Sequence, residues 1–533
     1  MASLQSPAPD RAHVGEGLSR KLTRTHRAIF FSFASVFLFL NLFLFNATPI
    51  WTGVDQHMFI LGAMRMRDGE VIYRDFFQFL FPGTETVFLA FLKVFGSRVW
   101  IPNLVLVVLG LGLVWTVVRV AERVVSGRCA LLAGLLFLTT VYRTELDASN
   151  HWFSTLAVML ALVTLMDLRT KPRLVAAGAL CGVGSFFNSA QGGFALLGFA
   201  AFLLWEERSG KMRWRDLYAS ISWLFGSFIV SVVTLNSYFV WKAGLNRFFW
   251  CTVVFVLKYY RELQGANTPS VYMTDLPFAS FSLRGIAGLS VMMFVYILVP
   301  FAYLLFLFVY RREKQRPDSN WHGLALLTSL GLLMFLGVLA SPTRFRLCGV
   351  SPPAFIILAW LMDGRGRLDR ALRAMLWLVA ASLAIYEPLG RQIQWHGVMD
   401  APTGRVAFLA RDQWDKYRWL ARNTHPGEYF FDSFDSDVYV LLNLRDPGEV
   451  PWLTADAYTR PEQVQNMVSG LERHHVRMIL WTTHLDNVPR NALGDSLAPL
   501  RAYLHQHYQP VKYFPDLYEA WQRNDKPGGR ASR

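Results

Sequence analysis

The chain has 533 residues, of which 53% are hydrophobic and 15% aromatic, and its formal net charge at pH 7 is +15. With a positive mean hydropathy, this composition excludes an ordinary soluble protein and is typical of a polytopic membrane protein. A basic chain can also bind nucleic acid. Here, however, Lys and Arg fall in short clusters between apolar segments, so we interpret them as topology signals and expect no nucleic-acid partner.

Apolar segments recur along the chain at about the length that crosses a bilayer, roughly 20 residues. The basic segment 1–27 before the first of them is interpreted as a cytoplasmic tail, because its apolar part comes too late for a cleaved signal peptide. Region 28–388 is predicted to hold about eleven spans. These are 28–47, 100–119, 129–145, 151–167, 173–188, 191–206, 217–241, 285–310, 322–341, 348–363 and 371–388.

Basic residues cluster in alternate loops, which predicts that those loops face the cytoplasm. The clusters lie in 119–128, 169–173, 208–215, 311–316 and 365–373. An odd number of spans then places the C-terminal part on the opposite side from the N-terminus. We assign the apolar segment 79–95 to the membrane interface, because Pro82 to Glu85 interrupt it and counting it would invert every later basic loop.

Three segments are therefore predicted on the outer face: the loop 47–99, a loop at about 242–284, and the tail 389–533. Residues 56–67 are predicted to form an amphipathic helix on the membrane surface. The middle loop contains NRFFWCTVVFVLKYYREL, with interfacial Trp, Tyr and Lys anchors. The tail alternates strand and helix patterns and includes a buried strand, ILWTT, so the expected fold is an α-helical polytopic membrane protein with a small C-terminal α/β soluble domain.

Few motifs point to soluble chemistry. Neither a G-x-x-x-x-G-K nor a G-x-G-x-x-G phosphate loop is present. The cysteines are far apart, three of them in apolar runs, and form no disulfide framework and no metal-ligand spacing. They are Cys129, Cys181, Cys251 and Cys348, and we interpret them as packing residues.

Asp55 follows the first predicted span almost directly. A carboxylate at the lipid-water boundary loses hydration at a cost, so its presence requires a reason. Two reasons remain open from chemistry alone. Asp55 is either a reactive group or the N-cap of a helix that begins near Gln56.

The block from Asp55 through GAMRMRDGEVIYRDFFQFLFPG to FLKVFG resembles the first outer loop of the GT-C-fold membrane glycosyltransferases. That group includes lipid A aminoarabinose transferase and the protein O-mannosyltransferases. The predicted topology and the terminal outer-face domain are similar to it too, although only the first 190 residues match at the level of motifs. The resemblance implies transfer of a hexose or pentose from a polyprenyl-phosphate donor to a lipid, polysaccharide or protein acceptor, with inversion and with Asp55 as general base.

The resemblance also implies a second acidic position in YRTELDASNHW. Asp147 is the candidate and Glu145 its rival, and the alternative is that both cap the following helix. Many members follow the first Asp with Glu, whereas this chain has Gln56, which puts a role for two adjacent acids in doubt. Gln56 is retained as a substrate-binding candidate.

Tyr73 and Arg74 lie in the Tyr-Arg-Asp-Phe-like segment and are further substrate-binding candidates. For Arg74 we favour the alternative of a local ion pair with Asp75 that braces the loop.

The leaving phosphate of such a donor should lie near cations. Some members of the group carry a lysine after the fifth span, but here FFNSAQGGF offers only Asn188 and Gln191. Arg344 and Arg346 in SPTRFRLCGVSPP resemble an arginine that precedes a proline-containing helix, and a planar guanidinium suits phosphate. The alternative is that both contact lipid headgroups.

His57 and His151 could join Asp55 and Asp147 as ligands of a divalent metal ion, although no spacing signature supports a metal. Two other classes of function stay open. One is a transporter or flippase of a lipid-linked solute, which should show charged residues deep in its spans and often a repeat. The other is a non-catalytic assembly protein of the same fold. The expected location is the bacterial inner membrane, with a cytoplasmic N-terminus and a periplasmic C-terminal domain.

Overall fold

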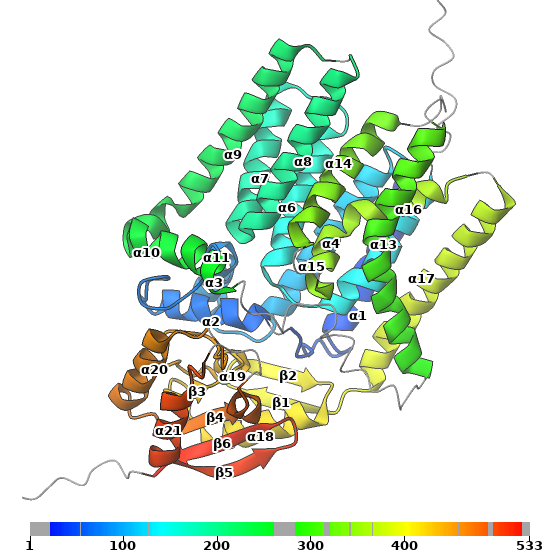
Figure 1. The fold of residues 1–533 in the computed structure, drawn as a ribbon. Coiled ribbons are helices and arrows are strands. Elements are labelled where there is room, and N and C mark those ends of the chain that lie inside the picture. Colours follow the sequence, from blue (N-terminus) through cyan, green and yellow to red (C-terminus); the bar gives the residue numbers. More distant parts are fainter. Residues whose placement is uncertain are drawn as a thin grey trace, which may run out of the picture.

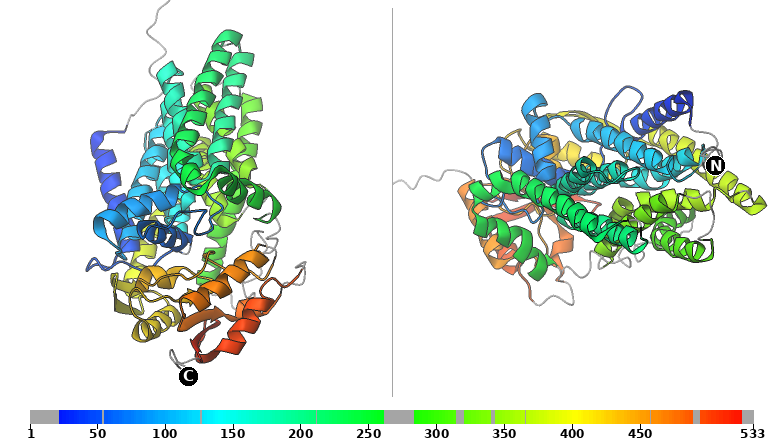
Figure 2. Two further views of the ribbon diagram at one scale, coloured as in Figure 1. Left: turned by 90° about the vertical axis from the view of Figure 1, so that its left-hand side faces the viewer. Right: turned by 90° about the horizontal axis from the view of Figure 1, so that it is seen from above.

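The structure is a computed structural model that describes residues 22–53, 55–125, 127–210, 212–260, 283–313, 320–339, 343–364, 366–456, 458–488 and 494–524. A bundle of long helices forms one part of the molecule, and a mixed domain that contains the sheets lies at one end of it (Figure 1). Figure 2 shows the same arrangement from the side, with the first helix along one edge of the bundle. Most of the predicted tail 1–27 and of the loop 242–284 lies outside the described residues.

Each predicted apolar segment contains helix. The bundle comprises α1 (Arg24–Leu42), α4 (Ile101–Ala121), α5 (Cys129–Leu136), α6 (Asn150–Leu165), α7 (Lys171–Phe187), α8 (Ser189–Arg208), α9 (Trp214–Ala243), α13 (Leu283–Glu313), α14 (Trp321–Val338), α15 (Arg344–Val350), α16 (Pro352–Leu361) and α17 (Arg367–Ile393). Within the described ranges, α1, α4, α9 and α14 are long and apolar enough to cross a membrane, and the bent pair α15 and α16 would make a fifth span. The chain is thus an integral membrane protein, while the count of eleven spans stays a prediction.

The first helix begins and ends earlier than the expected span 28–47. Thr23 is its N-cap, and the hydroxyl of Thr23 accepts a hydrogen bond of 3.2 Å from the backbone N–H of His26. A capped end satisfies a donor that would otherwise lack a partner, so the helix starts at Arg24. It ends at Leu42, and a bridge between Phe43 and Pro49 follows.

Short elements separate the bundle from the mixed domain (Figure 1). They are α2 (Asp55–Arg67), α3 (Gly83–Phe95), α10 (Leu245–Phe249), a π-helical turn (Trp250–Val254) and α11 (Phe255–Lys258). With 13 residues, α3 is too short to cross a bilayer, in agreement with its assignment to the interface. The helical part of the predicted stretch 246–263 is α10 to α11.

The predicted surface position of α2 is wrong. Every residue from Gln56 to Met64 is buried, so both the polar and the apolar side of this helix are covered. Its neighbours are α3 and α19 (Asp437–Leu442) of the C-terminal domain. A helix enclosed on both sides keeps polar side chains only if they find partners.

The C-terminal part contains both sheets. Its elements are β1 (Gly397–Ala401), β2 (Gly404–Phe408), α18 (Arg411–Asn423), β3 (Phe431–Asp432), α19, α20 (Pro461–Arg473), β4 (Met478–Thr482), α21 (Ala498–His507), β5 (Tyr508–Phe514) and β6 (Tyr518–Arg523). Strands β1 and β2 form an antiparallel pair, and a second sheet has the order β3-β4-β6-β5 with only β3 and β4 parallel. The predicted buried strand ILWTT is confirmed except at its last residue, since β4 ends at Thr482 and all five of its residues are buried. The segment 429–443, YFFDSFDSDVYVLLN, has a strand-like pattern, but only Phe431–Asp432 form a strand there and Asp437–Leu442 form helix α19.

Candidate active site

Asp55 is the first residue of α2, and its side chain is partly buried at the junction of the bundle and the C-terminal domain. Among the described residues, none donates a hydrogen bond to its carboxylate. Burial raises the pKa of Asp55, and the positive charge of Arg346 opposes part of this rise. Asp55 is therefore a carboxylate with a basicity increased by its surroundings and an arginine close by.

Asp147 caps α2 from across the fold. Its Oδ1 accepts a hydrogen bond of 2.8 Å from the backbone N–H of Gln56. A carboxylate at the N-terminus of a helix is favoured because the helix dipole is positive there. The sequence had left open that Asp147 caps the following helix, but Ser149 is the N-cap of α6. Burial and the neighbouring Asp55 raise the pKa of Asp147 well above its ordinary value.

Gln56 completes the connection between α2 and the loop at Asp147. Its Oε1 accepts a hydrogen bond of 2.8 Å from the backbone N–H of Ala148, and its Nε2 donates to the backbone oxygen of Thr52. Both ends of the amide are used, which a glutamate at this position could not reproduce. Gln56 thus holds the segment around Asp55 in place.

Glu145 and Arg344 form an ion pair, with 2.5 Å between Oε1 and Nε. Burial raises the pKa of Glu145, Arg344 lowers it, and the charge of Asp55 raises it again. The carboxyl groups of Asp55, Glu145 and Asp147 are thus close enough to influence one another. The positive charge of Arg344 is balanced by Glu145.

Arg346, the second expected arginine, lies on the other side of the site. Its guanidinium donates a hydrogen bond of 2.7 Å to the hydroxyl of Tyr260, whose ring stacks on Phe79 at 4.8 Å between centroids. The adjacent Phe345 packs edge-on against His151 at 4.4 Å. The start of α15 therefore brings Arg346 towards Asp55 while its neighbour packs against α6.

Asn188 and Gln191 hold the helices behind the site together. Asn188 is the N-cap of α8, and its Nδ2 lies 3.4 Å from Nδ1 of His151. Gln191 donates from Nε2 to the hydroxyl of Thr155 at 2.8 Å and to the backbone oxygen of Gly349 at 3.2 Å. These contacts tie α8 to α6 and α15, so they help to position α15, the helix that carries Arg344 and Arg346.

His57 points to the C-terminal domain. Its Nδ1 lies 2.6 Å from Oδ1 of Asp437, and its ring stacks on Trp51 at 4.4 Å. The described residues contain no group of three or more His, Cys, Asp or Glu side chains that could hold a metal ion. Because His57 is bound to Asp437 and Asp147 to α2, the expected donor set does not fit a metal.

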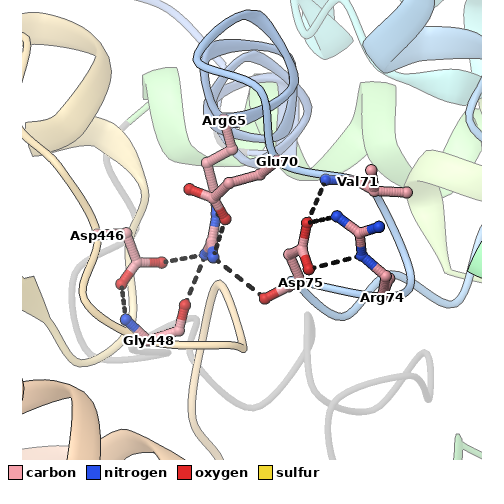
Figure 3. Close-up of polar contacts among 7 residues, drawn as sticks. All are labelled: Arg65, Glu70, Val71, Arg74, Asp75, Asp446 and Gly448. Atoms are coloured by element: carbon pink, nitrogen blue, oxygen red, sulfur yellow. Dashed lines mark hydrogen bonds and ion pairs between the residues drawn. The ribbon is translucent and has the colours of Figure 1, made fainter.

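Two expected residues lie apart from Asp55. Tyr73 is fully buried, and its hydroxyl donates a hydrogen bond of 2.7 Å to the backbone oxygen of Leu80. Arg74 forms an ion pair of 2.8 Å with Asp75 and is half exposed (Figure 3). Both contacts brace the loop after α2, as the local-pair interpretation of Arg74 expected.

Arg65 attaches the other end of α2 to the C-terminal domain (Figure 3). Its guanidinium bonds Glu70 at 2.6 Å and the backbone oxygen of Gly448 at 2.6 Å, and it lies 3.4 Å from Asp446. The catalytic candidate therefore stands on a helix that is held at its N-terminus by Asp147 and at its C-terminus by Arg65.

Sequence reasoning named no site residue in the C-terminal domain or in the middle loop. Asp437 supports His57, and the hydroxyl of Tyr417 donates to the same carboxylate at 3.0 Å. Tyr458 is buried, and burial is the main cause that raises its pKa. The nearby Tyr260 and, to a smaller extent, the charge of Asp55 raise the pKa of Tyr458 further. The acidic run DSFDSDVY was the only sequence signal for a contribution of the C-terminal domain, and it has no spacing that indicates a partner.

No protein-family model and no curated protein sequence matches the chain. Solved structures do. ArnT from Cupriavidus metallidurans, bound to undecaprenyl phosphate, aligns with a TM-score of 0.57 and 14% identity over 94% of this chain and 98% of that one. The same protein in the apo state gives a TM-score of 0.56 at 14% identity over 93% of this chain and 97% of that one.

The archaeal oligosaccharyltransferase AglB from Archaeoglobus fulgidus, in complex with an inhibitory peptide and a dolichol-phosphate, gives a TM-score of 0.50 at 13% identity. That alignment covers 94% of this chain and 75% of AglB. At such identities the likeness concerns the arrangement of the elements. The helix bundle, the loop 47–99 with Asp55 and the terminal domain together have the GT-C fold.

Proposed function

We propose that the chain is a glycosyltransferase that moves a sugar from a polyprenyl-phosphate-linked donor to an acceptor hydroxyl. The observation that carries the proposal is the open carboxylate of Asp55 next to Arg346, beside Glu145 and Asp147. The fold supports it, since structures of the same fold were solved with undecaprenyl phosphate and with a dolichol-phosphate. A base and a cation side by side are what transfer from a phosphate leaving group requires.

The chemistry is a single displacement. The acceptor oxygen attacks the anomeric carbon as the bond from that carbon to the phosphate oxygen breaks, and the phosphate leaves with the electron pair. Asp55 takes the proton of the acceptor hydroxyl, and its raised pKa makes it a stronger base. Arg346 stabilises the negative charge on the leaving phosphate. A single attack from the opposite side inverts the anomeric configuration.

Asp147 and Gln56 act through α2 in this scheme and are positioning residues. Their hydrogen bonds set the first turn of the helix, from which the Asp55 side chain extends. Arg344 sets the position of Glu145, and Asn188 and Gln191 set the start of α15. Small displacements of a base relative to its substrate reduce rates strongly, so such residues matter without touching the reacting atoms.

We infer the orientation from charge. The basic clusters described at the ends of α4, α6 and α8 and at the start of α7 lie at the end of the bundle opposite the C-terminal domain (Figure 1). Since loops rich in Lys and Arg stay in the cytoplasm, the C-terminal domain and Asp55 would face the periplasm of a bacterial inner membrane. The domain 389–533 would then cover the site from the water side.

Transfer of labelled sugar from polyprenyl-phosphate donors in liposomes tests the proposal. Asp55→Asn keeps size and removes the charge, and we expect it to lower the rate by at least about 100-fold. The matched control Asp75→Asn changes an aspartate of the same loop that pairs with Arg74, and should keep most activity. Equal rates for native chain and Asp55→Asn would contradict the assignment of the base.

The same liposomes distinguish the other two functions. A flippase would move a labelled lipid-linked sugar across the bilayer without forming a new glycosidic bond, and Asp55→Asn would not stop it. A non-catalytic assembly protein would transfer no sugar from any donor, and Asp55 would be replaceable without effect on assembly in cells.

A further inference from the structure

A cavity of about 310 Å³ lies at the end of the bundle opposite the C-terminal domain. It is formed by the C-terminal ends of α4 and α6 and by the beginning of α7, so it is remote from Asp55 along the helices (Figure 1). Val163 and Met166 contribute an apolar wall. The remaining part is strongly charged.

Three arginines and one carboxylate line the cavity, which therefore carries two net positive charges. Arg123 forms an ion pair of 2.7 Å with the carboxylate, Asp167. In the part of the chain that the structure describes, no carboxylate lies within ion-pairing distance of Arg173. One guanidinium is thus available to an anion from outside the chain.

The positive charge of Arg119 is only partly balanced by a carboxylate. Arg119 lies 3.5 Å from Glu122, and Glu122 also pairs with Arg27 of α1 at 2.9 Å. One carboxylate shared between two guanidinium groups leaves positive charge at the cavity.

An exposed apolar face of α4 adjoins the cavity. Trp115 precedes Arg119 by one turn on the same face of α4, and 44% of its surface is exposed. Val108, further along α4, is 61% exposed, as expected for a surface covered by acyl chains. Tryptophan is enriched at the boundary between headgroups and hydrocarbon, so the arginines stand at headgroup depth.

We propose that this cavity binds the phosphate group of an anionic phospholipid, with an acyl chain along the exposed face of α4. The planar forks of Arg119 and Arg173 match phosphate oxygens. Basic pockets between membrane helices are suited to such headgroups, and the cytoplasmic leaflet is rich in anionic lipid. The binding site is independent of the proposed transferase reaction.

Native mass spectrometry of the full chain in detergent, titrated with phosphatidylglycerol, tests the site. Phosphatidylglycerol should bind the native chain more tightly than zwitterionic phosphatidylcholine. Each arginine near a phosphate contributes about 1 kcal/mol, so the double variant Arg119→Gln with Arg173→Gln should bind roughly thirty-fold more weakly. Arg208→Gln, an exposed arginine at the end of α8 and outside the cavity, is the matched control and should change binding less than about twofold.

Asp167→Asn provides a test of opposite sign. It removes the one lining carboxylate and releases Arg123, so it should tighten binding of phosphatidylglycerol. Weakened binding in Asp167→Asn, equal binding in the double variant, or an equal loss in Arg208→Gln would overturn the proposal. Binding of inorganic phosphate in preference to the lipid would identify a free phosphate, and would overturn the assignment to a phospholipid.

Discussion

Nδ1 of His57 lies 2.6 Å from Oδ1 of Asp437, and this contact joins the helix of Asp55 to the C-terminal domain. Burial alone would raise the pKa of Asp437. The charge and hydrogen bond of His57 and the hydrogen bond of Tyr417 outweigh burial and hold this pKa below its ordinary value. The terminal domain is thus coupled to the proposed site two residues from its base.

We expect Asp437→Asn to weaken this coupling, because the amide cannot replace the charge that faces His57. A double-mutant cycle with His57→Phe should give a coupling of about 1 to 3 kcal/mol. The measurement is the thermal midpoint in detergent at pH 7, with the exposed Asp400→Asn as control. Because folding lowers the pKa of Asp437, the ionised carboxylate stabilises the fold above pH 3.8, and this stabilisation is lost as the pH falls further. Additive effects of the two substitutions would contradict the coupling.

Glu85 should make stability fall as pH rises. It is fully buried in α3, accepts a hydrogen bond of 2.7 Å from Gln78, and its pKa is raised by burial to about 8. The contribution of Glu85 to the free energy of unfolding is therefore fully present below pH 4.5, the ordinary pKa of Glu. It is lost as the pH rises through 8, and the loss is as much as about 5 kcal/mol.

The variant Glu85→Gln should remove most of that pH dependence, since it keeps a polar group of the same size without a charge. Thermal midpoints at pH 5, 7 and 9 measure it. Glu462→Gln, on the exposed surface of α20, is the control and should leave the native pH profile unchanged. A Glu85→Gln profile as steep as that of the native chain would show that Glu85 does not ionise in this range.

Arg346 should determine donor affinity. We expect Arg346→Gln to weaken binding of a polyprenyl phosphate by about 10- to 100-fold, because a hydrogen bond to a charged group contributes roughly 1.5–3 kcal/mol. Arg346→Lys keeps the charge but not the planar fork of donors, so its affinity should lie between those of the native chain and of Arg346→Gln. Tyr260→Phe removes only the hydrogen bond to Arg346 and controls for its position. Native affinity in Arg346→Gln, measured by fluorescence with a labelled carrier, would exclude this role.

Arg65 should stabilise the junction more at high pH than at low pH. Burial raises the pKa of Asp446 to about 6, and the positive charge of Arg65 opposes part of this rise. In Arg65→Gln, Asp446 loses its cation, which costs about 3–5 kcal/mol when the carboxylate is charged and less when it is protonated. Thermal midpoints should therefore fall further at pH 8 than at pH 5. The control is Arg67→Gln, which alters an exposed pair with Asp68, and an equal fall at both pH values would argue against the mechanism.

The sequence by itself determined the helical bundle and the buried strand β4. An apolar segment of bilayer length must satisfy its backbone internally, so it forms helix whatever its neighbours are. It also indicated which charged groups belong to one site. Asp55, Asp147, Glu145, Arg344 and Arg346 do lie close together in the fold.

Only the tertiary structure decided what those groups do. Asp147 caps a helix 91 positions away, and His57 pairs with an aspartate 380 positions away, so neither local periodicity nor spacing contains the information. The same holds for α2, whose amphipathic pattern predicts a surface helix. Helix α3 and helix α19 of the C-terminal domain both pack against this helix, and burial on both sides is a property of the assembled fold.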